Sequence, residues 1–511
     1  MTKKSLVTGA LILTAASFIT RILGFVYRIY MSNLIGAEGM GLYQLIFPIY
    51  MLAWTISASG ISLSVSKLVA QENAKREYGN ISRIIKISVL LSVGIGLIIS
   101  VFIYYFAPWI ATSILKEPRT ILSLKILASC VPFMAAASSI KGYFYGLQEM
   151  TKPAASQVLE QISRMLVIYL LASFFIPKGL SYACALSVIG MCVGELVSFL
   201  YVLISYKRNK QRKKKVKKPT LNWFQSCSAL LVMAIPLTGN RFITTLLSSI
   251  ENIMIPIQLQ AFGMSNAEAI SIYGQFSGMA MPLIFFPSML TGSLSVALVP
   301  AVSEAKAVNN TRQIHRTVSK SIHFTCLIGI GATCLFAVFP KELGLSIYNQ
   351  ADVGDMLYSM AWICPFFYLQ ATLAGILNGL GQQISTFKHN VIGSIISILF
   401  IYFLVPVYGF KGFLWAVIVS SIVITLLHLR TVLKYTSLTL ELSKWVIRPA
   451  LAAVASSLTA KYILNHYLLT QFSLRWSMAF TLIALTIVYI IFLFVLQSIS
   501  KEDLKTLKRN I

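Results

Sequence analysis

Four polar residues in an otherwise apolar stretch share one helical face. Gln157, Glu160, Gln161 and Arg164 follow i, i+3, i+4, i+7 spacing, which aligns them in one stripe if the segment is a helix. Such a stripe is costly against lipid, so it is expected to face a protein interior or a wet cavity. Glu160 and Arg164 can also pair along their own helix. The pattern therefore predicts a cavity wall, with a structural ion pair as the alternative.

Basic residues in two other apolar stretches extend this prediction. Arg21 and Arg28 are seven apart, nearly two helical turns, so they share a face. Arg21 is expected in the cavity, or else in an ion pair with Glu195. Arg28 either joins it or reaches to the membrane interface. Lys125 and Lys141 add positive charge from a further stretch.

The five cations Arg21, Arg28, Lys125, Lys141 and Arg164 outnumber the two carboxylates of the same region. A net positive cavity attracts an anion, and arginine suits bidentate contacts to phosphate. We therefore expect an anionic substrate, bound by these cations together with Gln157, Glu160 and Gln161.

Three further residues suggest coupling and gating. Glu251 lies within an apolar stretch, so it is either a proton or cation site or a structural carboxylate. Pro48 and Pro287 interrupt long apolar stretches, where a proline can kink a helix and permit gating.

The composition is that of a membrane protein. Of its 511 residues, 57% are hydrophobic and 12% are charged, about half the charged share of a soluble domain. Apolar runs of helix-spanning length recur from end to end, which predicts an all-α membrane protein. We expect about fourteen spans, near residues 6–30, 41–66, 84–106, 121–146, 154–176, 180–205, 229–260, 269–300, 318–339, 356–380, 386–406, 412–433, 445–466 and 476–498.

The basic residues segregate to one side of these spans. The formal charge of +27 includes nine Lys or Arg within residues 207–218. The positive-inside rule then places this segment and both termini in the cytoplasm. Alternatively, the basic segment 207–218 binds anionic membrane lipids. No motif supports nucleic-acid binding. The seven cysteines lie in or beside apolar runs without C-x-x-C spacing, which favours buried thiols.

The two halves of the chain repeat weakly. Gly146-Leu147-Gln148 and Gly379-Leu380-Gly381 are 233 apart, and Ser62–Val65 and Ser293–Val296 are 231 apart. Six spans precede the second copy, so the repeats should be parallel, and rocking of two such lobes is typical of transporters. The expected parts are an N-lobe (1–205), a basic cytoplasmic linker (206–222), a C-lobe (223–436), and two further spans with a cytoplasmic tail (437–511).

The enzyme alternative is a membrane glycosyltransferase or polymerase. The chain has three aspartates and contains neither H-E-x-x-H nor G-x-x-x-x-G-K-[ST], so we expect no catalytic residue, metal site or cofactor. Without a phosphate-binding loop, the expected energy source is a Na⁺ or H⁺ gradient or the membrane potential.

Four segments carry a family resemblance: Thr20–Phe25 with Arg28, Ser66–Ala70, Ser156–Gln161 and Pro282–Ser288. With them the chain resembles the polysaccharide-transporter branch of the multidrug/oligosaccharidyl-lipid/polysaccharide exporter superfamily. It is also similar to lipid II flippases, in which the arginine matching Arg21 serves the lipid head group.

The resemblance implies a V-shaped, two-lobed fold and a flippase for an undecaprenyl-pyrophosphate-linked saccharide, such as a peptidoglycan precursor for spore cortex. It further implies a bacterial cell membrane or a sporulation-related membrane as the location, and cell-wall synthesis proteins as partners. Multidrug export is the alternative, but cationic drugs call for acidic cavity residues, and the first span offers arginines.

Overall fold

The computed structural model describes residues 3–212, 219–220, 222–436, 438 and 441–499. Every regular element in these ranges is a helix. Apolar segments in a bilayer must satisfy their backbone groups internally, and a helix does so within one segment. The expected all-α membrane protein is confirmed.

Eleven described helices are long and apolar enough to cross a membrane, or twelve if α13 and α14, bent by 59°, form one span. The expectation of fourteen differs at two places. The expected spans 6–30 and 41–66 run together in one apolar stretch, Ala15–Ala74. The non-helical backbone of Gly36 (φ 70°, ψ −175°) kinks this stretch into two helices, and it continues through η1 (Thr55–Ser59) into α2 (Gly60–Ala74). The expected span 445–466 falls on α17, which has 16 residues and is flanked by π-helical turns.

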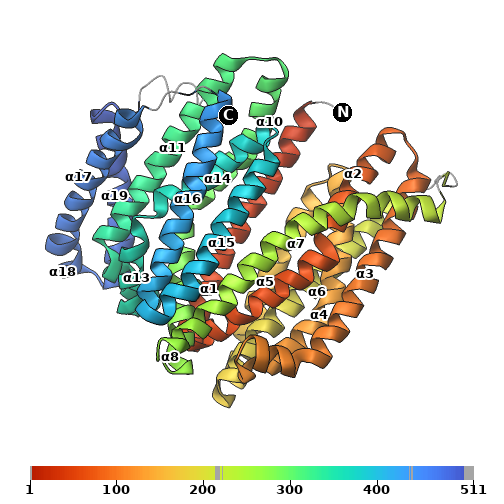
Figure 1. The fold of residues 1–511 in the computed structure, drawn as a ribbon, viewed down its shortest axis with the longest axis horizontal. Coiled ribbons are helices and arrows are strands. Elements are labelled where there is room, and N and C mark those ends of the chain that lie inside the picture. Colours follow the sequence, from red (N-terminus) through yellow and green to blue (C-terminus); the bar gives the residue numbers. More distant parts are fainter. Residues whose placement is uncertain (1–2, 213–218, 221, 437, 439–440, 500–511) are drawn as a thin grey trace. The chain divides into compact units, whose positions relative to one another are not determined.

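The chain folds as two compact units, the first comprising residues 1–260 and 264–274. Its long helices run from red to yellow-green in Figure 1. They are α1 (Lys3–Trp54), α2 (Gly60–Ala74), α3 (Tyr78–Trp109), α4 (Ile121–Gly146), α5 (Thr151–Phe175), α6 (Leu180–Arg212), α7 (Trp223–Ala261) and the short α8 (Asn266–Tyr273). Short turns join them: η1 (Thr55–Ser59), η2 (Ile110–Ile114), η3 (Pro118–Thr120) and η4 (Ile176–Lys178).

The second unit comprises residues 261–263 and 275–511. Its helices are α9 (Met281–Phe285), α10 (Ser288–Ala307), α11 (Thr311–Val338), α12 (Pro340–Tyr348), α13 (Ala351–Ala361), α14 (Cys364–Gly379), α15 (Gln383–Tyr408), α16 (Phe410–Thr436), α17 (Arg448–Ile463), α18 (Leu469–Gln471) and α19 (Leu474–Val495). Its π-helical turns are η5 (Gly274–Ala280), η6 (Ser443–Ile447) and η7 (Leu464–Leu468). Helix α17 packs on α11 and α19.

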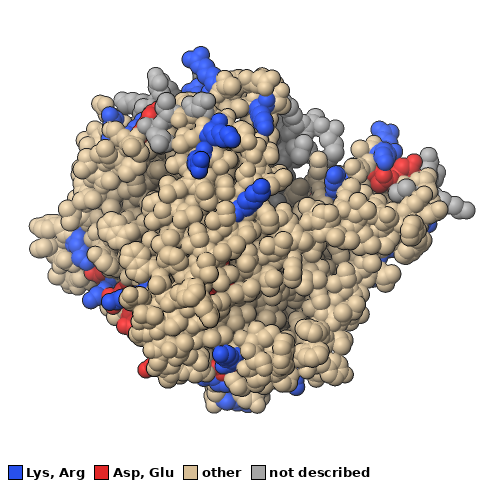
Figure 2. Space-filling model, in the orientation of Figure 1, with Lys and Arg blue, Asp and Glu red and all other residues tan. Residues whose placement is uncertain are grey.

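Much of the surface is apolar. On α3, for example, Ile98 and Tyr105 are 70% and 75% exposed. In Figure 2 most of the face drawn carries no charge, and Lys and Arg side chains gather toward its edges. Exposed apolar area of this extent requires lipid contact.

Helix α7 packs in the first unit, although the sequence assigned it to the C-lobe. Leu230 and Ala234 of α7 are buried in the same apolar cluster as residues of α2, α3, α4 and α6. The compact unit thus extends beyond the basic segment. That segment is helical as far as Arg212, and residues 213–218 and 221 of the expected linker lie outside the described residues, as does the tail 500–511.

The two units share one plan of internal contacts. The hydroxyl of Ser62 donates to the carbonyl of Ser138 (2.9 Å), and that of Ser295 donates to the carbonyl of Ala371 (2.6 Å). Each residue of the second bond follows its counterpart by 233 positions. Two further pairs keep this offset: Ser92–Ser139 with Thr325–Thr372, and Ser100–Ala128 with Thr333–Ala361. These three pairs support the repeat at an offset of 233. They also correct one expected match: the counterpart of Ser62 is Ser295, so the match of Ser62–Val65 with Ser293–Val296 at an offset of 231 is out of register by two residues.

A charged cluster fixes α8 within the first unit. Arg119 donates to Glu117 (Nε to Oε1, 2.7 Å) and to Glu38 (Nη1 to Oε1, 2.6 Å), and the Asn266 amide of α8 donates to Glu117 (2.8 Å). Burial alone would raise the pKa of Glu117, but the hydrogen bonds from Arg119 and Asn266 outweigh it and lower that pKa.

Because the pKa of Glu117 is lowered by folding, its stabilising contribution is present above the ordinary glutamate pKa of about 4.3 and is lost as pH falls through the lowered value. We expect Glu117→Gln to destabilise the protein at pH 7 by about 1–3 kcal/mol. The melting temperature of the variant should also fall less than that of the wild type when the pH is lowered. Thermal melting in detergent measures both effects. The exposed Glu441→Gln is the control, and equal pH profiles for the two variants would contradict the assignment.

Candidate substrate cavity of the first unit

The first unit contains a cavity of about 730 Å³. Helices α1, α2, α4, α5, α6 and α7 and the turn η1 line it. The lining residues are Ser17, Thr20, Arg21, Trp54, Ser59, Ser62, Leu63, Ser66, Met134, Ser138, Lys141, Tyr145, Met150, Gln157, Glu160, Gln161, Glu195 and Arg241. A volume of this size suits a small-molecule head group.

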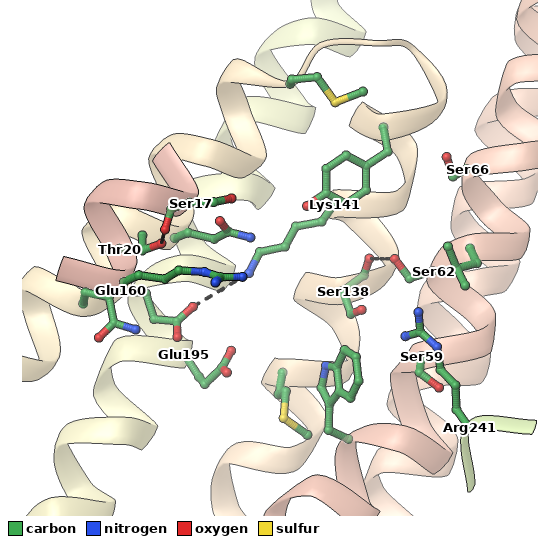
Figure 3. A pocket seen from close by; sticks show the side chains of 18 residues that line it. Ser17, Thr20, Ser59, Ser62, Ser66, Ser138, Lys141, Glu160, Glu195 and Arg241 are labelled. Atoms are coloured by element: carbon green, nitrogen blue, oxygen red, sulfur yellow. Dashed lines mark hydrogen bonds and ion pairs between the residues drawn. The ribbon is translucent and has the colours of Figure 1, made fainter. Parts of the chain in front are cut away.

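The polar stripe of α5 forms one wall. Gln157, Glu160 and Gln161 line the cavity, whereas Arg164 lies one turn further along the helix. Arg164 Nη2 donates to Glu160 Oε1 at 3.3 Å. Lys141 Nζ lies 3.9 Å from Glu160 Oε2, and Figure 3 shows these two side chains. The Arg164 side chain is 12% exposed, and no described residue forms a hydrogen bond with its buried Nε. The pairing along α5 thus occurs together with, not instead of, a cavity-facing stripe.

Arg21 does not pair with Glu195. The Glu195 carboxylate instead accepts a hydrogen bond from the Tyr50 hydroxyl at 2.7 Å. Arg21 is exposed, lines the cavity, and makes no ion pair with another described residue. Its guanidinium charge is therefore available to a ligand.

A second cation, Arg241, enters the cavity from α7. It is exposed, and its guanidinium lies 6.0 Å from the ring centroid of Trp54, which also lines the cavity. Within the described part of the chain, Arg241 has no carboxylate partner. Sequence reasoning missed this residue because the basic segment seemed to separate α7 from the first lobe.

Hydroxyl groups line the remaining surface. Ser59, Ser62 and Ser66 form one stripe at i, i+3, i+7 spacing across η1 and α2. Figure 3 shows Ser59, Ser62 and Arg241 on one side, and Ser17, Thr20 and Glu160 on the other. Helical spacing of serines was a signal that could have revealed this wall.

Several expected site residues lie elsewhere. Arg28 is half-buried on α1 and does not line the cavity, and Lys125 Nζ lies 5.6 Å from the ring centroid of Tyr104 instead. Glu251 also lies outside the lining. The chain does break at Pro287, between α9 and α10, but Pro48 lies within α1 without interrupting it. Gating by the two prolines remains a prediction.

The negative charges of the cavity are paired, whereas two of its positive charges are not paired with a carboxylate. Both lining carboxylates, Glu160 and Glu195, have partners within the first unit, whereas neither Arg21 nor Arg241 has a carboxylate partner among the described residues. Guanidinium groups in a partly dehydrated cavity offer charge-assisted bonds to an anion. The cavity is therefore suited to an anionic head group.

Comparisons with known proteins identify the family of this chain. The family model described as polysaccharide biosynthesis protein matches residues 6–306, and the MatE model matches residues 266–403. Stage V sporulation protein B of Bacillus subtilis (strain 168) is 30% identical over 509 residues, which cover 99% of this chain and 98% of that protein. Lipid II flippase MurJ of the same organism is 24% identical over 432 residues, covering 77% and 76% of the two chains.

A solved structure of lipid II flippase MurJ in an inward closed conformation matches with a TM-score of 0.67 at 16% identity, covering 94% of this chain and 98% of that one. At this identity the likeness shows the fold alone. The resemblance inferred from the sequence motifs is confirmed. The chain belongs to the polysaccharide biosynthesis protein family and is a multi-pass membrane transporter of the multidrug/oligosaccharidyl-lipid/polysaccharide exporter superfamily.

Proposed function

We propose that this protein flips an undecaprenyl-pyrophosphate-linked saccharide, a peptidoglycan precursor for spore cortex, by alternating access. One observation carries the proposal: Arg21 and Arg241 line one cavity without a carboxylate partner among the described residues, while its own carboxylates are engaged by Tyr50, Lys141 and Arg164. An anionic group that enters exchanges water for guanidinium hydrogen bonds.

A pyrophosphate and its sugar make different demands, and the cavity can meet both. The guanidinium groups suit the phosphate oxygens through bidentate contacts. The Ser66 hydroxyl can donate to and accept from saccharide hydroxyls, and the hydroxyls of Ser59 and Ser62, which donate to backbone carbonyls, can still accept from them. An inside-negative potential favours outward movement of negative charge by about 2.3 kcal/mol per charge per 100 mV, so nucleotide hydrolysis is unnecessary.

The names of two relatives support the choice of cargo and membrane. One is a stage V sporulation protein and another is a lipid II flippase. We place the protein in the bacterial cell membrane or a sporulation membrane, with both termini cytoplasmic because basic residues segregate with the span order. Anionic lipids and cell-wall synthesis proteins are the partners this role requires.

Multidrug export is the alternative function. The MatE model matches part of the chain, and Glu195 is a buried carboxylate beside the cavity. A cationic drug would have to compete with Tyr50 for Glu195, and with two cations for Glu160. The engaged carboxylates therefore favour an anionic cargo.

Depletion of the protein during sporulation should cause a lipid-linked saccharide to accumulate on the cytoplasmic leaflet, because synthesis continues while flipping stops. Lipid extraction with leaflet-selective labelling measures this pool, and re-expression of the wild-type chain should clear it. If no such species accumulates and the cells instead become sensitive to cationic drugs, the exporter function is correct.

A further inference from the structure

The second unit holds a pair of histidines on two apolar helices, and the proposed cavity does not use them. His389 of α15 and His428 of α16 contact each other, with ring centroids 5.0 Å apart and ring planes inclined at 67°. His428 is 1% exposed. Both helices are among those long and apolar enough to span a membrane. Ionisable side chains in such segments are rare and usually functional.

The repeat relates His428 to a residue of the first unit. Glu195 precedes His428 by 233 residues, the offset that relates the internal contacts of the two units. Glu195 is the buried carboxylate beside the first-unit cavity. Each unit therefore places one buried ionisable group at the same point of its architecture, acidic in one and basic in the other.

The hydrogen bonds of the pair leave basic nitrogens available. His428 Nδ1 lies 2.7 Å from the carbonyl oxygen of Ile424. Because a carbonyl only accepts, Nδ1 carries the hydrogen, and Nε2 holds the lone pair in the neutral ring. The buried His389 Nδ1 has no hydrogen-bond partner among the described residues. An unsatisfied buried nitrogen calls for a functional explanation.

Other charges do not neutralise the pair. Helix α14, which packs on α16, carries no Asp, Glu, Lys, Arg or His. The charged residues of α15 and of the C-terminal half of α16, which are Lys388, Arg430 and Lys434, are exposed. Among the described residues, neither ring of the pair has an ion-pair partner. Two helices that touch α16 more lightly carry further ionisable residues: Arg312, His315, Arg316, Lys320 and His323 on α11, and Asp352 and Asp355 on α13. Protonation of one ring therefore disfavours protonation of the other.

The pair also lies where a charge would affect packing. A Cβ added to Gly393 of α15 would lie 2.2 Å from Cδ1 of Ile424 on α16. The two helices are therefore in close contact beside the rings. A charged imidazolium needs hydration or a new acceptor. Proton binding would thus change the packing of α15 on α16.

We propose that His389 and His428 form a one-proton binding site in the second unit, and that transport is coupled to proton binding there. A proton from water adds to a ring lone pair, no bond of the chain breaks, and the same proton returns to water on release. Proton binding stands independently, whereas coupling rests on the proposed flippase function.

The first experiment tests proton binding without any substrate. Imidazole ¹⁵N signals of the protein in lipid nanodiscs are followed from roughly pH 4 to 9, a range that includes the ordinary histidine pKa. We expect His389→Gln to shift the titration midpoint of His428 by at least about one pH unit, a tenfold change in proton affinity. His466→Gln is the matched control, because its Nδ1 also faces a backbone carbonyl (Tyr462, 3.2 Å) but its ring is exposed. Two rings that titrate independently, or wild-type rings that bind no proton, would overturn the site.

The second experiment tests coupling in proteoliposomes held at zero membrane potential. The probe is a fluorescent undecaprenyl-pyrophosphate-linked disaccharide, and quenching by external dithionite reports its leaflet distribution. A gradient of one pH unit should change that distribution by up to about tenfold for one coupled proton. His466→Gln should respond as the wild type does, and the His389→Gln/His428→Gln pair should not respond.

The outcomes separate the two proposals. A double variant that responds like the wild type refutes coupling through this pair. A wild-type protein that binds the proton but never moves the probe supports the histidine site and refutes the proposed cargo.

Discussion

Replacing Arg21 or Arg241 with alanine should weaken binding of an undecaprenyl-pyrophosphate head group by at least about tenfold and abolish flipping. Both guanidinium groups line the cavity, and neither is held by a carboxylate among the described residues. Each charge-assisted contact to phosphate contributes roughly 1.5–3 kcal/mol, and about 1.4 kcal/mol corresponds to tenfold in affinity. Arg164→Ala should act more indirectly, because Arg164 holds Glu160 and does not itself line the cavity.

Lysine variants separate charge from geometry. Arg21→Lys and Arg241→Lys keep a positive charge but lose the planar fork, so they should retain partial binding. Arg312→Ala, which removes an exposed arginine of α11, is the control and should bind normally. Binding to purified protein and complementation at native expression level provide the two measurements. Alanine variants that bind and complement like the wild type would exclude an anion site in this cavity.

The stripe on α5 shows what the sequence could predict about the site. Its spacing alone identified Gln157, Glu160 and Gln161 as cavity residues, because charges at membrane depth tolerate few other surroundings. The same reasoning included Lys125 and Arg28, which the structure places outside the lining. Spacing fixes which residues share a face of one helix, but neighbouring helices decide where that face points.

Arg241 illustrates the complementary limit. Its span was assigned to the C-lobe because a dense basic segment and the six-span repeat both suggested a boundary before residue 223. Packing instead buries Leu230 and Ala234 of α7 within the first-unit core. Charge patterns report which side of a membrane a loop occupies, and they do not report which helices share a core.

The repeat was the most informative pattern in the sequence, and the structure explains how it persists at low similarity. The shared contacts are hydrogen bonds from hydroxyls to carbonyls or to other hydroxyls, together with close helix approaches, and these need only small residues at fixed positions. The cavity charges are free of that constraint. The positions equivalent to Lys141 and Glu160 are Ala374 and Gly393, so the second unit repeats the architecture without the cationic cavity.

Close helix approaches at two glycine pairs should be the most sensitive points of the fold. Gly142 and Gly146 of α4 are four apart, and a Cβ on either would lie 2.6 Å from a backbone oxygen of α2. Their counterparts on α14 are Gly375 and Gly379, where a Cβ would lie 2.5 Å from the Ser295 oxygen and 2.9 Å from the Val299 oxygen. Backbone oxygens cannot move aside as flexible side chains can, so the helices themselves must separate.

We therefore expect Gly142→Leu and Gly375→Leu each to destabilise the protein by about 3 kcal/mol or more, at the upper end of overpacking penalties. Both should lower the melting temperature in detergent and the yield of folded protein, and to a similar extent, because the repeat gives the two sites the same contact. Gly94→Leu on α3 is the matched control, since a Cβ there would meet nothing within 4 Å. Leucine is also the better helix former, so the control should be neutral or slightly stabilised. If Gly375→Leu were as stable as the control while Gly142→Leu was not, the equivalence of the two packing sites would be refuted.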